Sequence, residues 1–152
     1  MKQEVAELWT EALRSGDYNQ ATGTLAKVDD TTGEVVGHCC LGVLCEIAIK
    51  HGVKVEREGR MRTEYADDDS DESYEYYDNI TFDDRDDLVP QSVKDWAGLK
   101  TNDASVINNY PDGSAEEEEM DNEFSDSLAG LNDSGKSFLD IANLIEKYTE
   151  EL

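Results

Sequence analysis

Basic residues are scarce in this sequence. Its 152 residues include 13 lysines and arginines against 37 aspartates and glutamates, which gives a formal net charge of −24. Nucleic-acid-binding proteins need clustered lysine and arginine to neutralise phosphate groups, and an anionic membrane surface repels so acidic a chain. We therefore expect no direct nucleic-acid binding and no membrane association. The charge suits a basic partner protein, or a partner that normally holds DNA.

Long apolar runs and a signal sequence are also missing. No stretch reaches the roughly 20 apolar residues of a transmembrane helix, and the N-terminal segment MKQEVAELW has no apolar core. These absences predict a cytoplasmic protein. Cysteine occurs only three times, and an odd number in a chain of this kind indicates free thiols rather than a disulfide framework. The length of 152 residues suits one domain with a core of useful size.

One markedly apolar segment stands out, HCCLGVLCEIAIKHG at 38–52, and it holds all three cysteines and both histidines. Its apolar residues recur at the spacing of one helical face, at Leu41, Leu44, Ile47 and Ala48. Gly52 suits the position just after a helix C-terminus, because glycine readily adopts the left-handed backbone found there. The pattern predicts a central buried helix over 40–51, around which the rest of the chain packs.

Apolar periodicity predicts further helices on both sides of this segment. Two of them cover 3–15 and 91–98, and two more form a C-terminal hairpin with a tight turn at 132–135. Ser137 is a good N-cap for the last helix, and Asp140 completes a capping-box-like pair with it. We therefore expect four or five helices.

Strand-like patterns lie between the first helix and residue 82. They predict a small hairpin within 17–37, strands at 53–57 and 60–65 that turn at Gly59, and strand segments at 74–77 and 80–82. The chain is therefore predicted to be a single α+β domain over 1–152, with its helices around the central one and a small antiparallel sheet. Acidic loops are expected at about 66–73 and 112–124.

Four phrases, in order along the chain, carry a resemblance to a known family. They are WTEALRSGDY at 9–18, CCLGVLC at 39–45, LVPQSVKDWAGL at 88–99 and LNDSGKSFLDIANLIE at 131–146. Together they resemble a widespread uncharacterised family of small tailed-phage proteins, and the CCLGVLC phrase is the most specific part. The resemblance implies a viral origin and a compact α+β domain, and it transfers no catalytic residues. The acidic material at 64–87 and 112–126 departs from it.

The cysteines and histidines do not form a convincing metal or catalytic set. Zinc needs four converging ligands, yet Cys39 and Cys40 are adjacent and point in different directions, and no second cysteine pair exists. A nucleophile near the helix start is an alternative, but His51 lies roughly 15 Å away at the other end. We expect buried cysteines, no metal, no cofactor, and a binding protein rather than an enzyme.

The acidic stretches allow a DNA-mimic hypothesis. Segment 64–87 holds twelve acids and only one base, Arg85. Carboxylates placed where phosphates would lie can block a DNA-binding enzyme. The candidate mimic acids are Asp67, Asp68, Asp69, Asp71, Glu72, Asp83 and Asp84. A solvated loop or adaptation to salt explains the same charge run. The run lacks the ligand spacing and central glycine of an EF-hand calcium loop.

A pocket for an anionic small molecule, such as a nucleotide signal, is the other alternative. The few bases beside the family-like phrases, and the amides at two helix starts, suit a phosphate group. The candidate ligand-binding residues are Arg14, Tyr18, His38, Cys40, Lys136 and Ser137. The simpler interpretation, which we favour, is that Arg14 and Lys136 serve helix ends or surface pairs.

These patterns lead to one preferred function and two alternatives. On the family resemblance, we expect a phage accessory protein in the cytoplasm of the infected host cell. It would act by binding, and would inhibit or sequester a host factor, with host defence as the natural target. The first alternative is a protein that binds a nucleotide or signal molecule. The second is an acidic DNA mimic that blocks a DNA-binding enzyme.

Overall fold

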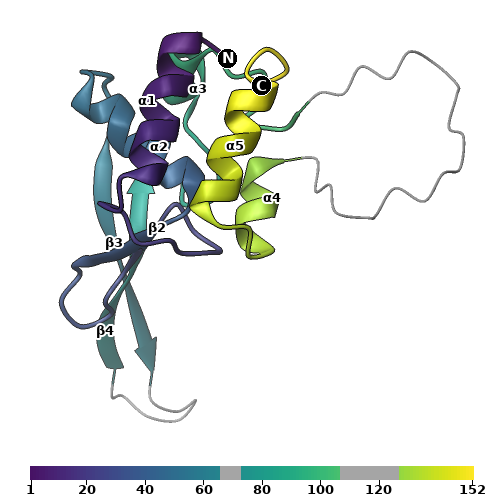
Figure 1. The fold of residues 1–152 in the computed structure, drawn as a ribbon. Coiled ribbons are helices and arrows are strands. Elements are labelled where there is room, and N and C mark those ends of the chain that lie inside the picture. The colour runs from purple at the N-terminus through teal and green to yellow at the C-terminus, as the bar shows by residue number, and fades with distance from the viewer. Residues whose placement is uncertain (66–72, 107–126) are drawn as a thin grey trace, which may run out of the picture.

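The structure is a computed structural model that describes residues 1–65, 73–106 and 127–152 (Figure 1). Within these residues it contains five helices and a four-stranded antiparallel sheet, so the predicted α+β fold is confirmed. The elements in chain order are α1 (Gln3–Arg14), β1 (Ala26–Val28), β2 (Val35–His38), α2 (Cys40–Lys50), β3 (Arg57–Tyr65), β4 (Ser73–Phe82), α3 (Gln91–Ala97), α4 (Leu128–Asp133) and α5 (Phe138–Tyr148). Apart from Ser73, the predicted acidic loops lie outside the described residues.

Helix α2 is the centre of the fold, as its apolar sequence predicts. It contacts α1, α3, α4 and β2, and all its residues from Cys40 to Cys45 are buried. The indole Nε1 of Trp9 in α1 donates a hydrogen bond of 2.9 Å to the carbonyl of Cys40. On the sheet side, α2 lies so close to the residue before β1 that a Cβ on Gly42 would be 1.7 Å from the Leu25 carbonyl oxygen. Glycine is therefore required at this point of contact.

The predicted helix ends agree with the structure to within one residue for α1, α2 and α3. Ser15, His51 and Gly98 are C-caps rather than the last helical residues, and Gly98 has the left-handed φ of 70°. The turn predicted at 132–135 begins too early, because α4 continues to Asp133. The capping box predicted at Ser137 is confirmed.

The sheet has the strand order β2-β1-β4-β3, and the hairpin predicted within 17–37 is present as β1 and β2. The predicted strand at 53–57 and its turn at Gly59 are wrong. Strand β3 begins at Arg57 and runs through Gly59, which pairs with Ile80. Pairing with a long partner strand outweighs the local tendency of glycine to turn.

Strand β4 is continuous, whereas the sequence predicted a break at 78–79. Asn79 pairs with Arg60, but the next pair joins Met61 to Tyr77, so Asp78 is an extra residue on β4. Such a bulge lets a strand continue past a residue that would otherwise disturb its register. The two short predicted strands are thus one strand of ten residues.

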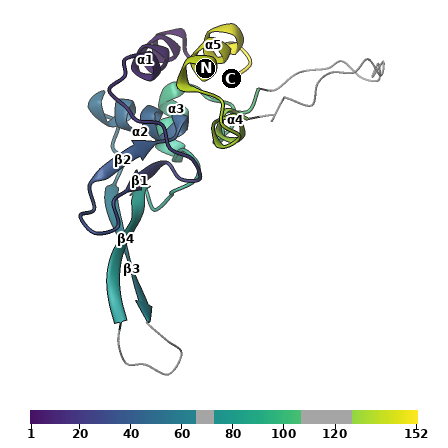
Figure 2. The ribbon, with the colours of Figure 1, turned by 60° about the horizontal axis from the view of Figure 1, so that its bottom comes forward.

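The outer part of the β3–β4 hairpin extends away from the helices, as both ribbon views show (Figure 1 and Figure 2). Strand β1 pairs with β4 only at Asn79 and Ile80, so among residues 1–65, 73–106 and 127–152 no third strand joins the hairpin beyond the bulge. All nine residues of β3 are exposed. We call residues 61–65 of β3 and 73–77 of β4 the arm.

Candidate functional site

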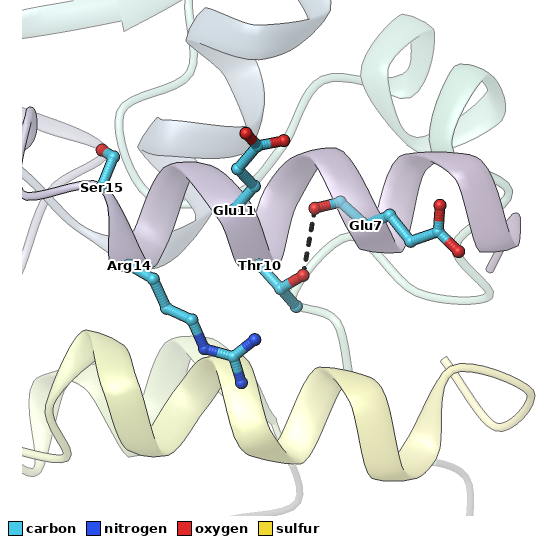
Figure 3. Close-up of a pocket in the computed structure, with 5 residues that line it drawn as sticks. All are labelled: Glu7, Thr10, Glu11, Arg14 and Ser15. Carbon is cyan, nitrogen blue, oxygen red and sulfur yellow. Dashed lines mark hydrogen bonds between the residues drawn. The ribbon is translucent and has the colours of Figure 1, made fainter.

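Arg14, the first predicted ligand-binding residue, joins two helices. It lies at a shallow groove of about 590 Å³ along α1, and its side chain reaches toward α5 (Figure 3). Its guanidinium forms an ion pair with Glu146 and donates a 2.7 Å hydrogen bond to Asn143. The hydrogen bond with Glu146 raises the pKa of Arg14 and lowers the pKa of the Glu146 carboxyl. An anionic ligand would have to displace Glu146.

Tyr18 and His38 are brought together, with ring centroids 5.3 Å apart in an edge-to-face arrangement. Lys50 Nζ donates a 2.8 Å hydrogen bond to the Tyr18 hydroxyl, and that bond raises the pKa of Lys50. His38 Nε2 lies 3.2 Å from Glu46 Oε1, which also accepts a 2.8 Å bond from Arg57 Nε. Burial acts to raise the pKa of Glu46, but the bonds with His38 and Arg57 outweigh it and lower that pKa. These side chains satisfy one another and tie α2 to β2 and β3.

Cys40 is fully buried and does not face an open pocket. Its Sγ contacts the carbonyl of Leu128 at 3.4 Å. Burial raises the pKa of Cys39 to about 11 and raises the pKa values of Cys40 and Cys45 well above the ordinary thiol value. The buried small-hydrophobe interpretation of the cysteines is confirmed. Across the described part of the chain, no group of three or more His, Cys, Asp and Glu side chains is placed to hold a metal ion.

We expect the three cysteines to be unreactive toward Ellman's reagent in the folded protein. The reactive species is the thiolate, and burial disfavours it while also blocking access. In guanidinium chloride all three should react as fast as N-acetylcysteine at the same pH, which is the control. One thiol that reacts at the control rate before unfolding would contradict this and restore a nucleophile hypothesis.

Lys136 and Ser137 belong to a polar junction that the sequence did not reveal. At its centre is Asn132, which is fully buried. Its Oδ1 accepts bonds from the Cys40 amide at 3.2 Å and from Gln20 Nε2 at 3.0 Å. Gln20 also donates to the Lys136 carbonyl and accepts from the first amide of α5, whose N-cap is Ser137. The junction holds the loop before β1 against α4 and α5.

The predicted ligand-binding residues therefore do not form one site. Arg14 bonds to residues of the second and third turns of α5, roughly 12 Å along the helix from its N-cap. Cys40 is enclosed, and His38 faces Glu46 instead. Tyr18 and His38 are in contact with each other. The signal for the junction was present in the LND phrase at 131–133, where an apolar helix end carries two short polar side chains.

Two predicted DNA-mimic acids can be placed, Asp83 and Asp84, which follow β4 with left-handed φ values of 49° and 63°. Asp83 Oδ1 accepts a 2.8 Å bond from the Glu56 amide, and its Oδ2 accepts a 3.1 Å bond from Ser92. Asp83 thus stabilises the turn, although both acids are exposed. Asp67, Asp68, Asp69, Asp71 and Glu72 lie outside the described residues.

The arm carries a surface that the sequence reasoning missed. Among the described residues, five large hydrophobic side chains are exposed, and three of them are on the arm. Tyr65 is 66% exposed, Tyr74 53% and Met61 51%. The alternation of Tyr74, Glu75 and Tyr76 was the available signal, since alternate strand residues face the same side. By the strand pairing, Met61 and Tyr65 lie on one face of the arm and Tyr74 lies on the other. Exposed aromatic side chains are typical of protein–protein interaction sites.

A groove lies on one face of the arm, where the loop after β1 approaches β4. Its volume is about 460 Å³, and it is lined by Asp30, Thr31, Glu64, Tyr74, Glu75 and Tyr76. The Asp30 carbonyl accepts a 2.9 Å bond from the Tyr77 amide, which fixes the loop against the strand. The Tyr74 hydroxyl donates a 2.7 Å bond to Glu64, and this bond raises the pKa of Tyr74.

The two edges of the sheet differ in how they are covered. At the β2 edge, the His38 amide donates to Asn19 and its carbonyl accepts from Ala21, so residues 19–21 cover that edge. At the other edge, β3 has no strand beside it among the described residues. An open strand edge offers backbone donors and acceptors to an added strand.

A comparison with protein families identifies the family of this chain. A family model described as a domain of unknown function (DUF8296) matches residues 1–149. The chain belongs to the DUF8296 family. No curated protein and no solved structure matches the chain. In the described part of this DUF8296 chain, none of the helices has the length and apolar character needed to cross a bilayer.

Proposed function

We propose that this DUF8296 protein acts by binding another protein through the arm. We further propose that it is a phage accessory protein, active in the cytoplasm of the infected host, that inhibits or sequesters a host factor, with defence as the natural target. The observation that supports binding is the arm itself, which combines exposed tyrosines with an open strand edge. The family resemblance of the sequence is the support for phage origin.

The alternatives have less support from the described residues. Arg14 and His38, which a nucleotide site would use, are already engaged by Glu146 and Glu46. Cys40 has no exposed surface. For DNA mimicry, Asp83 is occupied by bonds within the protein. The arm needs none of these side chains, and its own exposed side chains are available for contact.

Site-specific photo-crosslinking tests the proposal. A benzoylphenylalanine in place of Tyr65 is expected to form a discrete adduct with one host protein in infected cells. The matched control carries the same probe in place of Leu139, which is 58% exposed on α5, outside the arm. An adduct formed equally at both positions, or only at Leu139, would contradict binding through the arm.

The phage phenotype gives a second test of the same proposal. The double variant Met61→Ser with Tyr65→Ser removes two exposed side chains without touching the core, so the protein is expected to fold normally. It should no longer co-purify with the partner that the crosslink identifies and should lose the phenotype, whereas Leu139→Ser should keep both. Full phenotype in the folded double variant would refute the proposal.

A further inference from the structure

The charge of the arm is set by its carboxylates, because its neighbouring bases are already neutralised. The three arginines of β3 each form an ion pair: Arg57 with Glu46 at 2.8 Å, Arg60 with Asp86 at 3.2 Å and Arg62 with Asp78 at 2.7 Å. The carboxylates that line the groove are those of Asp30, Glu64 and Glu75. None of the described bases forms an ion pair with them. Residues 66–72 and 107–126 contain no lysine, arginine or histidine. The groove is therefore a region of uncompensated negative charge.

Two tyrosine rings form an aromatic wall beside these carboxylates. The ring centroids of Tyr74 and Tyr76 lie 6.1 Å apart with an interplanar angle of 37°. The bond from the Tyr74 hydroxyl to Glu64 holds its ring beside the acid. A guanidinium or ammonium group is attracted to the face of an aromatic ring, and arginine can also stack on it while it bonds to a carboxylate. A ring and an acid in this arrangement are complementary to one basic side chain.

The open β3 edge lies next to the same groove, because Glu64 belongs both to the edge strand and to the groove lining. An extended segment added to β3 would present every second side chain to the groove face. The charge also argues against other occupants. A phosphate-bearing ligand would meet Asp30, Glu64 and Glu75, and a second copy of this chain would bring another net charge of −24.

We propose that the arm groove receives an arginine or lysine side chain from an extended basic segment of the partner, which pairs with the edge of β3. This inference rests on the proposed function and adds the chemistry of the partner. Glu64, which is paired across the hairpin with Tyr74, would bond to the cationic group, and the Tyr74 ring would contact the face of that group. Tyr74 and Glu64 then have one shared role.

The probe that tests this is a synthetic peptide, acetyl-Thr-Arg-Val-Arg-Val-Arg-Thr-amide, titrated into the full-length protein by calorimetry. Its control has citrulline in place of every arginine, which keeps the shape and removes the charge. We expect the arginine peptide to bind at least about tenfold more tightly than the citrulline peptide. Its affinity should fall as the salt concentration rises. Equal affinity for the two peptides would overturn the proposal.

Matched variants separate the groove from the general acidity of the chain. Glu64→Gln, and separately Tyr74→Ala, should weaken binding of the arginine peptide at least about tenfold. Glu11→Gln removes the same charge from the exposed face of α1 and should change affinity less than about twofold. Equal losses in Glu64→Gln and Glu11→Gln would show charge attraction without a site, and would overturn the proposal. Circular dichroism checks that each variant is folded.

Failure of this inference can be told apart from failure of the proposed function. If the peptide does not bind but the crosslink at Tyr65 forms, the groove chemistry is wrong and binding through the arm stands. If the peptide binds at the groove but Tyr65 yields no specific crosslink, the proposed function fails in its choice of partner surface.

Discussion

Replacing Gly42 by alanine is expected to prevent stable folding. The added Cβ would lie 1.7 Å from the carbonyl oxygen of Leu25 and 2.6 Å from its carbonyl carbon. That same oxygen accepts a 3.1 Å bond from the Cys39 amide, which holds it in place. Backbone cannot move aside as the end of a flexible side chain can. The helix and the start of β1 would have to separate at a buried point of the fold.

The expected loss is large compared with the stability of a domain of this size. Overpacking of a core costs about 1–3 kcal/mol when side chains can adjust, and a clash with fixed backbone exceeds that range. We expect a loss of at least about 4 kcal/mol, against a typical total of about 5–15 kcal/mol. Urea unfolding, followed by circular dichroism, measures it. The expected signal is a sharply lowered midpoint or no cooperative transition.

A matched glycine variant shows whether the effect is local. In Gly59→Ala the new Cβ would meet its nearest neighbours, the side chains of Ile80 and Tyr77, at an ordinary 3.9 Å. Its stability is expected to stay within about 0.5 kcal/mol of the wild type. If Gly42→Ala unfolded at the same urea concentration as Gly59→Ala, α2 would not lie against the start of β1 as described.

The helices could be predicted because their local signals agree with their tertiary roles. The stripe of α1 and the apolar run of α2 match the faces that are buried, and Gly98 ends α3 with the backbone that only glycine adopts readily. The apolar stripe of a helix and its cap are both encoded by residues close together in the sequence. The sequence pattern of a short segment is therefore enough to locate these helices.

The strands of the arm were predicted at 60–65 and 74–77, and both segments are strands in the structure. The arm itself could not be predicted, since it depends on how these strands pair. Residues 57–62 show no clean alternation, and Gly59 favours a turn by itself. The ladder with β4 fixes β3 instead, including the bulge opposite Asp78 that keeps the register. No local pattern states that two such segments pair, or that β1 stops pairing at Asn79 and leaves the arm uncovered.

The candidate ligand-binding residues are not gathered in one place for a related reason. Arg14 was a candidate because it is one of the few bases beside the family-like phrases. The interpretation favoured above, a surface pair, agrees with its ion pair to Glu146, which is 132 residues away. Asn132 looked like part of a turn, yet its amide bonds to the start of α2 across 92 residues. Such long-range pairs decide whether a polar side chain is free to bind. Composition found the acidity of the chain, while only the fold shows which carboxylates remain unpaired.

The variant Asn132→Asp should be destabilised strongly at neutral pH and less so in acid. The Asn132 Nδ2 donates a 2.8 Å bond to the carbonyl of Ala21 and lies 3.3 Å from Asp133 Oδ1. Aspartate has nearly the same shape, but it would place an oxygen where this donor stands. An ionised carboxylate would then face two acceptors inside the protein. Leaving a buried charge without compensation costs about 3–5 kcal/mol.

The dependence on pH follows from the protonation of the new carboxyl group. Burial next to acceptors raises its pKa in the folded state above the value of about 3.9 expected in the unfolded chain. The loss in free energy of unfolding, relative to the wild type, is therefore complete at pH values above the folded-state pKa. The loss shrinks as the pH falls through the folded-state pKa, and it vanishes below the pKa of the unfolded chain. The protonated form can also donate its O–H to the Ala21 carbonyl, as the amide does.

Urea unfolding at pH 8 and at pH 5 measures the difference in free energy of unfolding between the variant and the wild type. The titratable groups that both proteins share contribute equally to the two values and cancel in the difference. The control is Asn143→Asp, which adds the same charge at an exposed position beside Arg14 and should change stability by less than about 0.5 kcal/mol at both pH values. A deficit in Asn132→Asp that is equal at the two pH values would mean that the side chain reaches water. In that case the junction would not hold the loop before β1, which continues into the sheet that carries the arm.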